Sequence, residues 1–255
     1  MRRIVFRAFI VASLAVIESW EIISPAAAQT SPIHQPSSEI DNVAVAGTDP
    51  SPPPLTHYLG REIAQTMHFT GAPWLTRDSR QREEDCETML AELGLETGMT
   101  VCDMGCGNGF YTLPMAKLVA PAGRVLAVDI QSEMLSLLKA RAEREGVPNI
   151  EPVLGTPVDP QLPEGEVDLI LLVDVYHEFS HPEPMLAAMR RSLSREGRIV
   201  LVEFRLEDPD VPIKLLHKMS KAQIRRELEA NGFALVREFD GLPWQHMMFF
   251  EAVEE

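Results

Sequence analysis

The sequence predicts an α/β protein built as a three-layer sandwich, in which helices cover both faces of a mostly parallel, seven-stranded sheet. Helix and strand patterns alternate along most of the chain, which is typical of strands joined by crossover helices. Several strand segments are apolar at nearly every position, as expected for strands that are buried on both faces. The last two predicted strands, residues 233–239 and 246–253, are joined by too few residues for a crossover. They must pair antiparallel, which places one antiparallel strand near the C-terminal edge of the sheet.

The composition is that of an ordinary globular protein of 255 residues, of which 45% are hydrophobic and 24% charged. A chain of this length can bury an extensive core without disulfides. The formal net charge is -15, and such an acidic surface repels phosphate backbones, so nucleic acid is not expected as a partner. The three cysteines, Cys86, Cys102 and Cys106, lack the spacing and the neighbouring histidines of a zinc site. They are therefore expected to be small buried thiols.

The N-terminus differs in character from the rest of the chain. Residues 1–28 have the pattern of a signal peptide. Arginines at the start are followed by an apolar run over 8–17 and by small residues before the expected cleavage site. That run is too short for a stable membrane span in the mature chain. Residues 29–55 are rich in Pro and Ser and predict a disordered linker, which leaves residues 56–255 as the folded domain. A signal peptide implies export to the periplasm or the extracellular space. If the apparent signal is an artefact of a wrongly chosen start site, the protein is cytoplasmic.

The first elements of the domain are expected to be helical. Residues 58–68 have an amphipathic pattern, and residues 78–93 place apolar side chains on one face. A short apolar run over 99–104 predicts a strand that leads into a glycine-rich loop. Helical spacing resumes at 110–119 and is broken by the Pro-Ala-Gly stretch at 121–123.

The second half of the domain continues the alternation. Ser132 is expected to cap a helix, and Ser220 with Gln223 predicts a capping box at the start of the last helix. The further predicted elements are strands at 124–128, 149–154, 168–173 and 197–203 and a helix at 183–193.

The glycine-rich loop is the strongest chemical signal. Residues 103–109 (DMGCGNG) lie between a predicted strand and a predicted helix, where glycines allow a ligand to approach the backbone closely. The helix N-terminus and the loop amides then face that ligand. Asp129 ends the next strand, where an acidic side chain accepts hydrogen bonds from both hydroxyls of a ribose. The spacing of the glycines does not match the pattern that binds a pyrophosphate, so the sequence predicts a nucleoside-like ligand without a diphosphate.

These residues resemble class I S-adenosylmethionine-dependent methyltransferases, whose fold is Rossmann-like. Residues 101–109 (VCDMGCGNG) resemble motif I of that family, and residues 174–179 (DVYHEF) resemble motif IV, which faces the methyl group. Thr156 stands where the family usually has an aspartate that contacts adenine, and Asp159 is an alternative if the loop bends back. Residues 219–233 resemble the late helix of small-molecule methyltransferases related to quinone biosynthesis. The resemblance spans about residues 85–253.

The resemblance implies that S-adenosylmethionine is the cofactor and that the loops after the strands bind it. Four of the implied residues, Asp103, Gly105, Gly107 and Asp174, would lie near the methionine end of the cofactor. The whole implied set of cofactor-binding residues is Asp103, Gly105, Cys106, Gly107, Gly109, Asp129, Ile130, Thr156 and Asp174.

His177 and Glu178 are the predicted catalytic residues. Methyl transfer from a sulfonium is an in-line displacement, so alignment supplies much of the acceleration. A base is needed only when the acceptor must lose a proton, and an imidazole is suited to that at neutral pH. Glu178 or Asp174 would orient the ring of His177. Alternatively, His177 only caps the following turn. No metal site is expected.

Two further segments have candidate roles. In the family, the segment before the sheet often covers the cofactor, so Arg77 or Arg80 could meet the methionine carboxylate, with Tyr58 and Trp74 nearby. A plain surface helix is the alternative. Residues 244–246 could line the acceptor pocket or close the edge of the sheet.

The predicted function is methyl transfer to a small-molecule acceptor. A protein that binds the cofactor without catalysis, as a regulatory or scaffolding module, is the alternative. A nicotinamide dehydrogenase is a third possibility, which the glycine spacing disfavours. Export conflicts with this function, because S-adenosylmethionine is made in the cytoplasm. The sequence assigns neither the acceptor atom nor an oligomeric state.

Overall fold

The computed structural model describes residues 52–253. The predicted signal peptide and the predicted linker up to residue 51 lie outside the described residues. The last four residues of that linker, 52–55, contact the folded domain. The amide of Leu55 donates to the carbonyl of Ser180 over 3.0 Å, and a ring nitrogen of His181 lies 2.7 Å from the carbonyl oxygen of Pro52.

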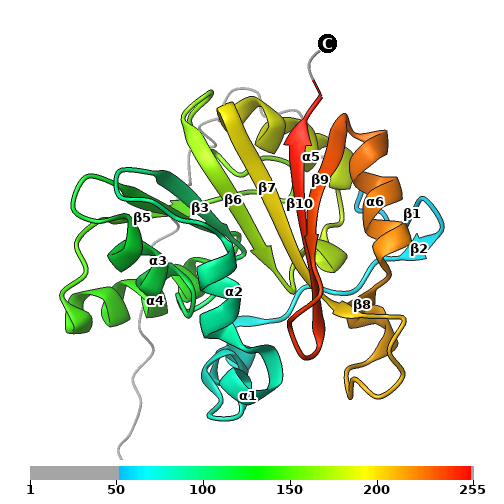
Figure 1. The fold of residues 1–255 in the computed structure, drawn as a ribbon, viewed down its shortest axis with the longest axis horizontal. Helices are drawn as coiled ribbons and strands as arrows, with labels where there is room; N and C mark the ends of the chain where they lie inside the picture. Colours follow the sequence, from blue (N-terminus) through cyan, green and yellow to red (C-terminus); the bar gives the residue numbers. More distant parts are fainter. Residues whose placement is uncertain (1–51, 254–255) are drawn as a thin grey trace, which may run out of the picture. The chain divides into compact units, whose positions relative to one another are not determined.

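The main sheet has the strand order β5-β4-β3-β6-β7-β10-β9 (Figure 1). All pairs from β5 to β7 are parallel, and β10 is antiparallel to both of its neighbours. The predicted seven-stranded sheet with one reversed strand near its edge is therefore confirmed. A short eighth strand, β8 (Lys218–Met219), which the sequence analysis did not predict, pairs with the end of β7. The seven strands are β3 (Thr100–Met104), β4 (Arg124–Asp129), β5 (Ile150–Leu154), β6 (Val167–Val173), β7 (Leu193–Arg205), β9 (Phe233–Phe239) and β10 (Gln245–Ala252).

Helices cover both faces of the sheet, and alternate residues of each central strand pack on opposite sides. Cys102 and Ile170 belong to a cluster with side chains of α5 and α6, whereas Val101 and Leu169 pack with side chains of α2 and α3. Because both sides of each central strand are buried, its sequence is apolar at nearly every position. The helices are α2 (Cys86–Glu92), α3 (Thr112–Val119), α4 (Ser132–Glu145), α5 (Pro182–Ser192) and α6 (Lys221–Ala230).

The segment before the sheet differs from the prediction. Residues 58–68 are not a helix: β1 (His57–Tyr58) and β2 (Arg61–Glu62) form a hairpin. The two turn residues between them, Leu59 and Gly60, both have positive φ, as a tight two-residue hairpin requires. The 3₁₀-helix η1 (Phe69–Thr76) follows.

The predicted helix over 78–93 is divided in two. Asp85 adopts a left-handed conformation, with φ of 49°, between α1 (Arg80–Glu84) and α2. Its carboxylate accepts a hydrogen bond from the amide of Thr88, over 3.4 Å. An aspartate tolerates this conformation and caps the next helix, which explains the break.

The two predicted caps also differ in detail. Ser132 is the first residue of α4, and the capping position is taken by Gln131, whose side chain makes no capping bond. Ser220 does cap α6, since its hydroxyl accepts from the amide of Gln223 over 3.1 Å. The side chain of Gln223 bonds to Leu59 and Glu227 rather than returning to Ser220. Within residues 52–253, no helix has the length and hydropathy needed to cross a bilayer.

Candidate cofactor and acceptor site

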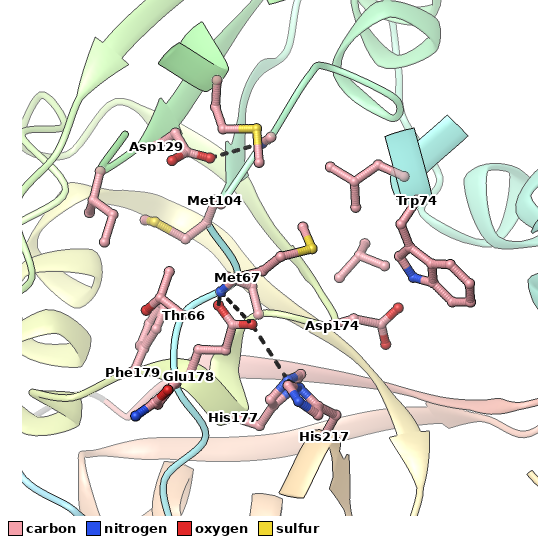
Figure 2. Close-up of a pocket in the computed structure, with 18 of the residues that line it drawn as sticks. Thr66, Met67, Trp74, Met104, Asp129, Asp174, His177, Glu178, Phe179 and His217 are labelled. Carbon is pink, nitrogen blue, oxygen red and sulfur yellow. Dashed lines mark hydrogen bonds and ion pairs between the residues drawn. The ribbon is translucent and has the colours of Figure 1, made fainter. Parts of the chain in front are cut away.

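A cavity of about 790 Å³ opens beside the carboxyl ends of β3, β4 and β6. Its volume falls within the roughly 300–1,000 Å³ that is typical of small-molecule sites, and parallel sheets bind ligands at this edge. Figure 2 shows Asp129 and Met104 toward one end of the cavity and His177, Glu178 and His217 toward the other. One cavity therefore contains the predicted nucleoside site and the predicted base.

The glycine loop forms one wall. Gly105 and Gly107 line the cavity with φ of 69° and 52°. A Cβ at Gly105 would collide with the side chain of Val175, and one at Gly107 would meet Leu75. Glycine at these two positions therefore lets the loop pack closely against Val175 and Leu75, which also line the cavity.

Asp129 joins this loop to the end of β4. Its Oδ2 accepts from the amide of Gly107 over 3.0 Å, and its Oδ1 accepts from the amide of Gln131 over 2.9 Å. The side chain lines the cavity. Burial raises the pKa of Asp129, although the backbone amides of Gln131 and Gly107 oppose that shift. Each carboxylate oxygen keeps a lone pair that can accept from a ligand hydroxyl.

Three of the implied cofactor residues do not line the cavity: Asp103, Cys106 and Gly109. Asp103 lies buried behind the loop, where its Oδ2 accepts from the hydroxyl of Thr112 over 2.5 Å, and burial raises its pKa to about 6. Cys106 belongs to a small apolar cluster, and a side chain at Gly109 would collide with Leu138. These residues shape the loop from beneath, because the loop must pack on α3 and α4.

Ile130 and Thr156, two more residues of the implied cofactor set, also line the cavity. The hydroxyl of Thr156 accepts from the amide of Asp159 over 3.0 Å. The carboxylate of Asp159 caps the amide of Gln161 over 2.7 Å instead of reaching the cavity. The alternative in which Asp159 bends back toward the ligand is therefore wrong.

Asp174 follows β6 in a left-handed conformation, with φ of 51°, and lines the cavity. Its Oδ2 accepts from the side-chain amide of Gln245 over 2.8 Å. Its Oδ1 is buried without a hydrogen-bond partner among the described residues. Burial, reinforced by the charges of Glu84 and Glu203, raises the pKa of Asp174 well above its usual range. A ligand cation would satisfy this orphaned oxygen.

The segment before the sheet covers one side of the cavity. The side chain of Gln131 makes two hydrogen bonds to the backbone of this segment. Its Nε2 donates to the carbonyl of Met67 over 2.9 Å, and its Oε1 accepts from the amide of Phe69 over 2.8 Å. Trp74, Arg77 and Arg80 line the cavity, whereas Tyr58 does not.

Both arginines of that segment are already paired with a carboxylate. Arg77 bonds to Glu84 over 2.6 Å, and Arg80 bonds to the same side chain over 2.8 Å. A ligand carboxylate at this position would share them with Glu84, which also lines the cavity.

His177 lies in the 3₁₀ turn η2 (Tyr176–Glu178) and is 2% exposed. Its Nδ1 lies 2.7 Å from Oε2 of Glu203, and its Nε2 lies 3.1 Å from Nδ1 of His217. Burial alone would lower the pKa of His177, but the charge and hydrogen bond of Glu203 outweigh it, and the pKa is raised. The prediction that Glu178 or Asp174 orients the ring is wrong, because Glu203 holds that position.

Glu178 has another place in the site. Its Oε1 lies 4.0 Å from Nε2 of His177, and both carboxylate oxygens accept from the amide of Met67 over 3.3 Å. Burial raises the pKa of Glu178 to about 7.

Sequence reasoning missed Glu203 and His217. Glu203 could have been noticed as the one charged residue in the apolar run 199–204, because a lone carboxylate in a doubly buried strand needs a partner. The residues of the last hairpin turn, 244–246, do not line the cavity. His246 pairs with Glu207 over 2.8 Å. The side-chain amide of Gln245 donates to Asp174, which does line the cavity.

Comparisons with known proteins agree with this geometry. The profile of a family described as methyltransferase domain matches residues 95–245. The demethylmenaquinone methyltransferase of Lactococcus lactis is 27% identical over 124 residues, which are 49% of this chain and 48% of that protein. The ubiquinone/menaquinone biosynthesis C-methyltransferase of Pseudomonas fluorescens is 31% identical over 112 residues, 44% of each. The chain thus spans about half the length, or less, of these curated relatives.

The fold has solved counterparts as well. The crystal structure of an S-adenosylmethionine-dependent methyltransferase from Aquifex aeolicus aligns with a TM-score of 0.70 and 26% identity. The alignment covers 74% of this chain and all of that one. The family profile extends over more than half of the chain, and its segment contains the glycine loop, Asp129 and His177. The chain belongs to the methyltransferase-domain family.

Proposed function

We propose that the protein transfers the methyl group of S-adenosylmethionine to a small-molecule acceptor. One observation carries the proposal: Gly105, Gly107 and Asp129 line the same cavity as His177. Donor and acceptor can therefore meet in one cavity, and alignment of the reacting atoms supplies much of the acceleration in such a displacement.

The residues present fit the cofactor. Asp129 would accept from the ribose hydroxyls, and the methionyl portion would lie along Gly105 and Gly107, which line the same cavity. The orphaned Oδ1 of Asp174 would accept from the methionine ammonium. When bound, the cofactor supplies an electrophilic methyl group on a sulfonium.

His177 is proposed as the proton acceptor for an O–H or N–H nucleophile. An ionised carboxylate only accepts hydrogen bonds, so Glu203 holds the proton of the neutral imidazole on Nδ1. The other nitrogen, Nε2, is then the basic one, and His177 lines the cavity. Glu178 lies beside that nitrogen and adds negative charge, which favours proton uptake.

The acceptor is proposed to be a compact, largely apolar molecule with one ionisable group. Many of the side chains that line the cavity are apolar, and they favour rings and short hydrocarbon chains. Two of the curated relatives are named as methyltransferases of quinone biosynthesis, which agrees with such an acceptor. Apolar residues that line the cavity include Met67, Val175, Phe179, Met185, Phe204, Pro212 and Ile213.

The test combines binding with transfer. Calorimetry of the full-length protein should show binding of S-adenosylhomocysteine and not of NADH. Incubation with methyl-labelled cofactor and the small-molecule fraction of a cell extract should then label one extract component. His177→Gln should lower that rate about 10²–10⁴-fold and leave the affinity for S-adenosylhomocysteine intact. Binding without transfer to any acceptor would support the non-catalytic alternative.

A further inference from the structure

Three potential metal ligands meet at the acceptor end of the cavity. They come from two 3₁₀ turns that pack together, η2 and η3 (Leu215–His217). One ligand atom from each of His177, Glu178 and His217 lies within 4.8 Å of the other two. All three side chains line the cavity.

The spacing of the two imidazoles matches a shared metal. Zinc binds histidine nitrogens at about 2.0–2.1 Å in tetrahedral geometry, which places two such nitrogens roughly 3.4 Å apart. The nitrogens of His177 and His217 are separated by 3.1 Å. The rings are nearly perpendicular, at 88°, and are therefore not stacked.

The carboxylate of Glu178 would have to move closer to the two imidazoles to share a metal with them. Its Oε1 lies 4.0 Å from Nε2 of His177, against roughly 3.4 Å for two ligands of one tetrahedral zinc ion. The hydrogen bonds that it accepts from the amide of Met67 measure 3.3 Å each. Bonds of this length are weak, so they hold the carboxylate loosely.

Glu203 provides the support that metal-binding histidines usually have. Histidine ligands commonly give their second ring proton to a carboxylate, which fixes the ring and makes the ligating nitrogen more basic. Glu203 is fully buried and lies 2.7 Å from Nδ1 of His177. Its other oxygen accepts from the amide of Tyr176 over 2.8 Å, so the carboxylate is itself immobilised.

The charge of the cluster also favours a dication. Glu178 and Glu203 form no ion pair with a lysine or arginine anywhere in residues 52–253. The nearby guanidinium of Arg61 bonds to Glu227 and to the backbone carbonyl of His177 instead. Two carboxylates and two neutral imidazoles would carry two negative charges, which one divalent cation neutralises.

We propose that His177, Glu178 and His217 bind one divalent transition-metal ion, with zinc the best match, and leave an open coordination position toward the cavity. Two nitrogens and one carboxylate suit zinc or a neighbouring first-row ion, whereas magnesium and calcium prefer oxygen ligands. This site does not rest on methyl transfer, because its occupancy can be measured without an acceptor.

The metal site changes how His177 acts. Its Nε2 cannot hold a proton and a metal at once, so with the cation bound His177 is a ligand. The cation would then lower the pKa of an acceptor oxygen or nitrogen at the open position, and the proton would be released to bulk water. His177 is the proton acceptor only in the metal-free protein.

Metal binding to the full-length protein tests the proposal. After treatment with EDTA and its removal, calorimetry with Zn²⁺ should show one saturable site, and Co²⁺ should give the visible absorption of four-coordinate cobalt. His217→Gln and Glu178→Gln should each weaken Zn²⁺ binding at least about 100-fold, and Glu203→Gln about 10- to 100-fold. His57→Ala, which removes an exposed histidine that does not line the cavity, should bind as the wild type does.

The substitutions are chosen so that the fold is retained. His217 and Glu178 lie at the cavity surface, and retained affinity for S-adenosylhomocysteine would show that each variant is folded. The proposal is overturned if the wild type has no saturable Zn²⁺ or Co²⁺ site, or if His217→Gln and Glu178→Gln bind Zn²⁺ as tightly as the wild type. One-site Zn²⁺ binding in a protein that transfers no methyl group would uphold the metal site and refute the proposed function.

Discussion

The Nδ1 atom of His177 lies 2.7 Å from Oε2 of Glu203, a contact that joins the turn after β6 to the buried end of β7. The other oxygen of Glu203 accepts from the amide of Tyr176. The carboxylate therefore accepts two hydrogen bonds, one with each oxygen. This arrangement determines which ring nitrogen of His177 faces the cavity without a proton.

Glu203→Gln should reverse that tautomer. The single carbonyl oxygen of glutamine can accept from Tyr176, and its NH₂ group would then donate to Nδ1 of His177, which moves the ring proton to Nε2. We expect the transfer rate to fall about 10²–10⁴-fold, with little change in affinity for S-adenosylhomocysteine. Steady-state kinetics beside calorimetry would measure both quantities.

The chain offers a matched control for this variant. Glu207 pairs with His246 over 2.8 Å, and neither residue lines the cavity. Glu207→Gln should leave the transfer rate near that of the wild type. Equal losses in the two variants would mean that Glu203 acts only through the stability of the fold.

Asp129→Ala should weaken cofactor binding. The substitution removes the ribose acceptor and also frees the amides of Gly107 and Gln131. Each lost hydrogen bond to a charged group costs about 1.5–3 kcal/mol, so the affinity for S-adenosylhomocysteine should fall by at least about 10-fold. Asp159→Ala is the control, since that carboxylate bonds to Gln161 outside the cavity. Unchanged affinity in a folded Asp129→Ala protein would refute the ribose assignment.

Gly105→Ala should lower the affinity for the cofactor in addition to the loss of stability that backbone strain causes. Gly105 and Gly94 both have positive φ, but a Cβ at Gly94 meets nothing within 4 Å, whereas one at Gly105 collides with Val175. Both substitutions should cost roughly 1–2 kcal/mol of folding free energy for the left-handed conformation. Only Gly105→Ala should also lower the affinity for S-adenosylhomocysteine, by about 10-fold or more.

Urea denaturation and calorimetry on the same samples would separate the two effects of Gly105→Ala. The double variant Gly105→Ala/Val175→Ala should recover part of the affinity, because the shorter side chain makes room for the new methyl group. A Gly94→Ala protein that loses as much affinity as Gly105→Ala would contradict this account.

The sequence predicted the sheet well because its signals are local. Apolar runs and the glycine loop identify strands and their order along the chain, and the short last connection requires an antiparallel pair. The hairpin at residues 57–62 was missed because the segment has helical spacing. The left-handed turn at Leu59 and Gly60 overrides that spacing, and a non-glycine residue in this conformation leaves little trace in a sequence.

The site was predicted only in part, for a different physical reason. Gly105, Gly107 and Asp129 line the cavity as expected, since their positions follow from one strand–loop–helix unit. Glu203 and His217 reach His177 from sequence separations of 26 and 40 residues. Which distant side chains meet depends on how the strands are ordered and how the late loop folds, and no local pattern contains that information.

Asp103 should make the stability of the protein depend on pH. Burial raises its pKa to about 6 from the usual value of 3.8, although the hydrogen bond from Thr112 opposes the shift. Between these two values the unfolded chain releases the proton before the folded chain does. The folded state then binds more protons, so the free energy of unfolding falls as pH rises through this window. The full effect is roughly 3 kcal/mol, since each unit of pKa shift corresponds to about 1.4 kcal/mol.

Asp103→Asn should remove this contribution, because an amide has no proton to lose and can still accept from Thr112. The variant should therefore gain stability relative to the wild type as pH rises from about 4 to 7. Urea denaturation of both proteins across this range would measure the difference, which also cancels the contributions of the other buried carboxylates. Asp210→Asn removes an exposed charge, and its free energy of unfolding should change with pH in parallel with that of the wild type. Parallel curves for Asp103→Asn would show that folding does not raise the pKa of Asp103.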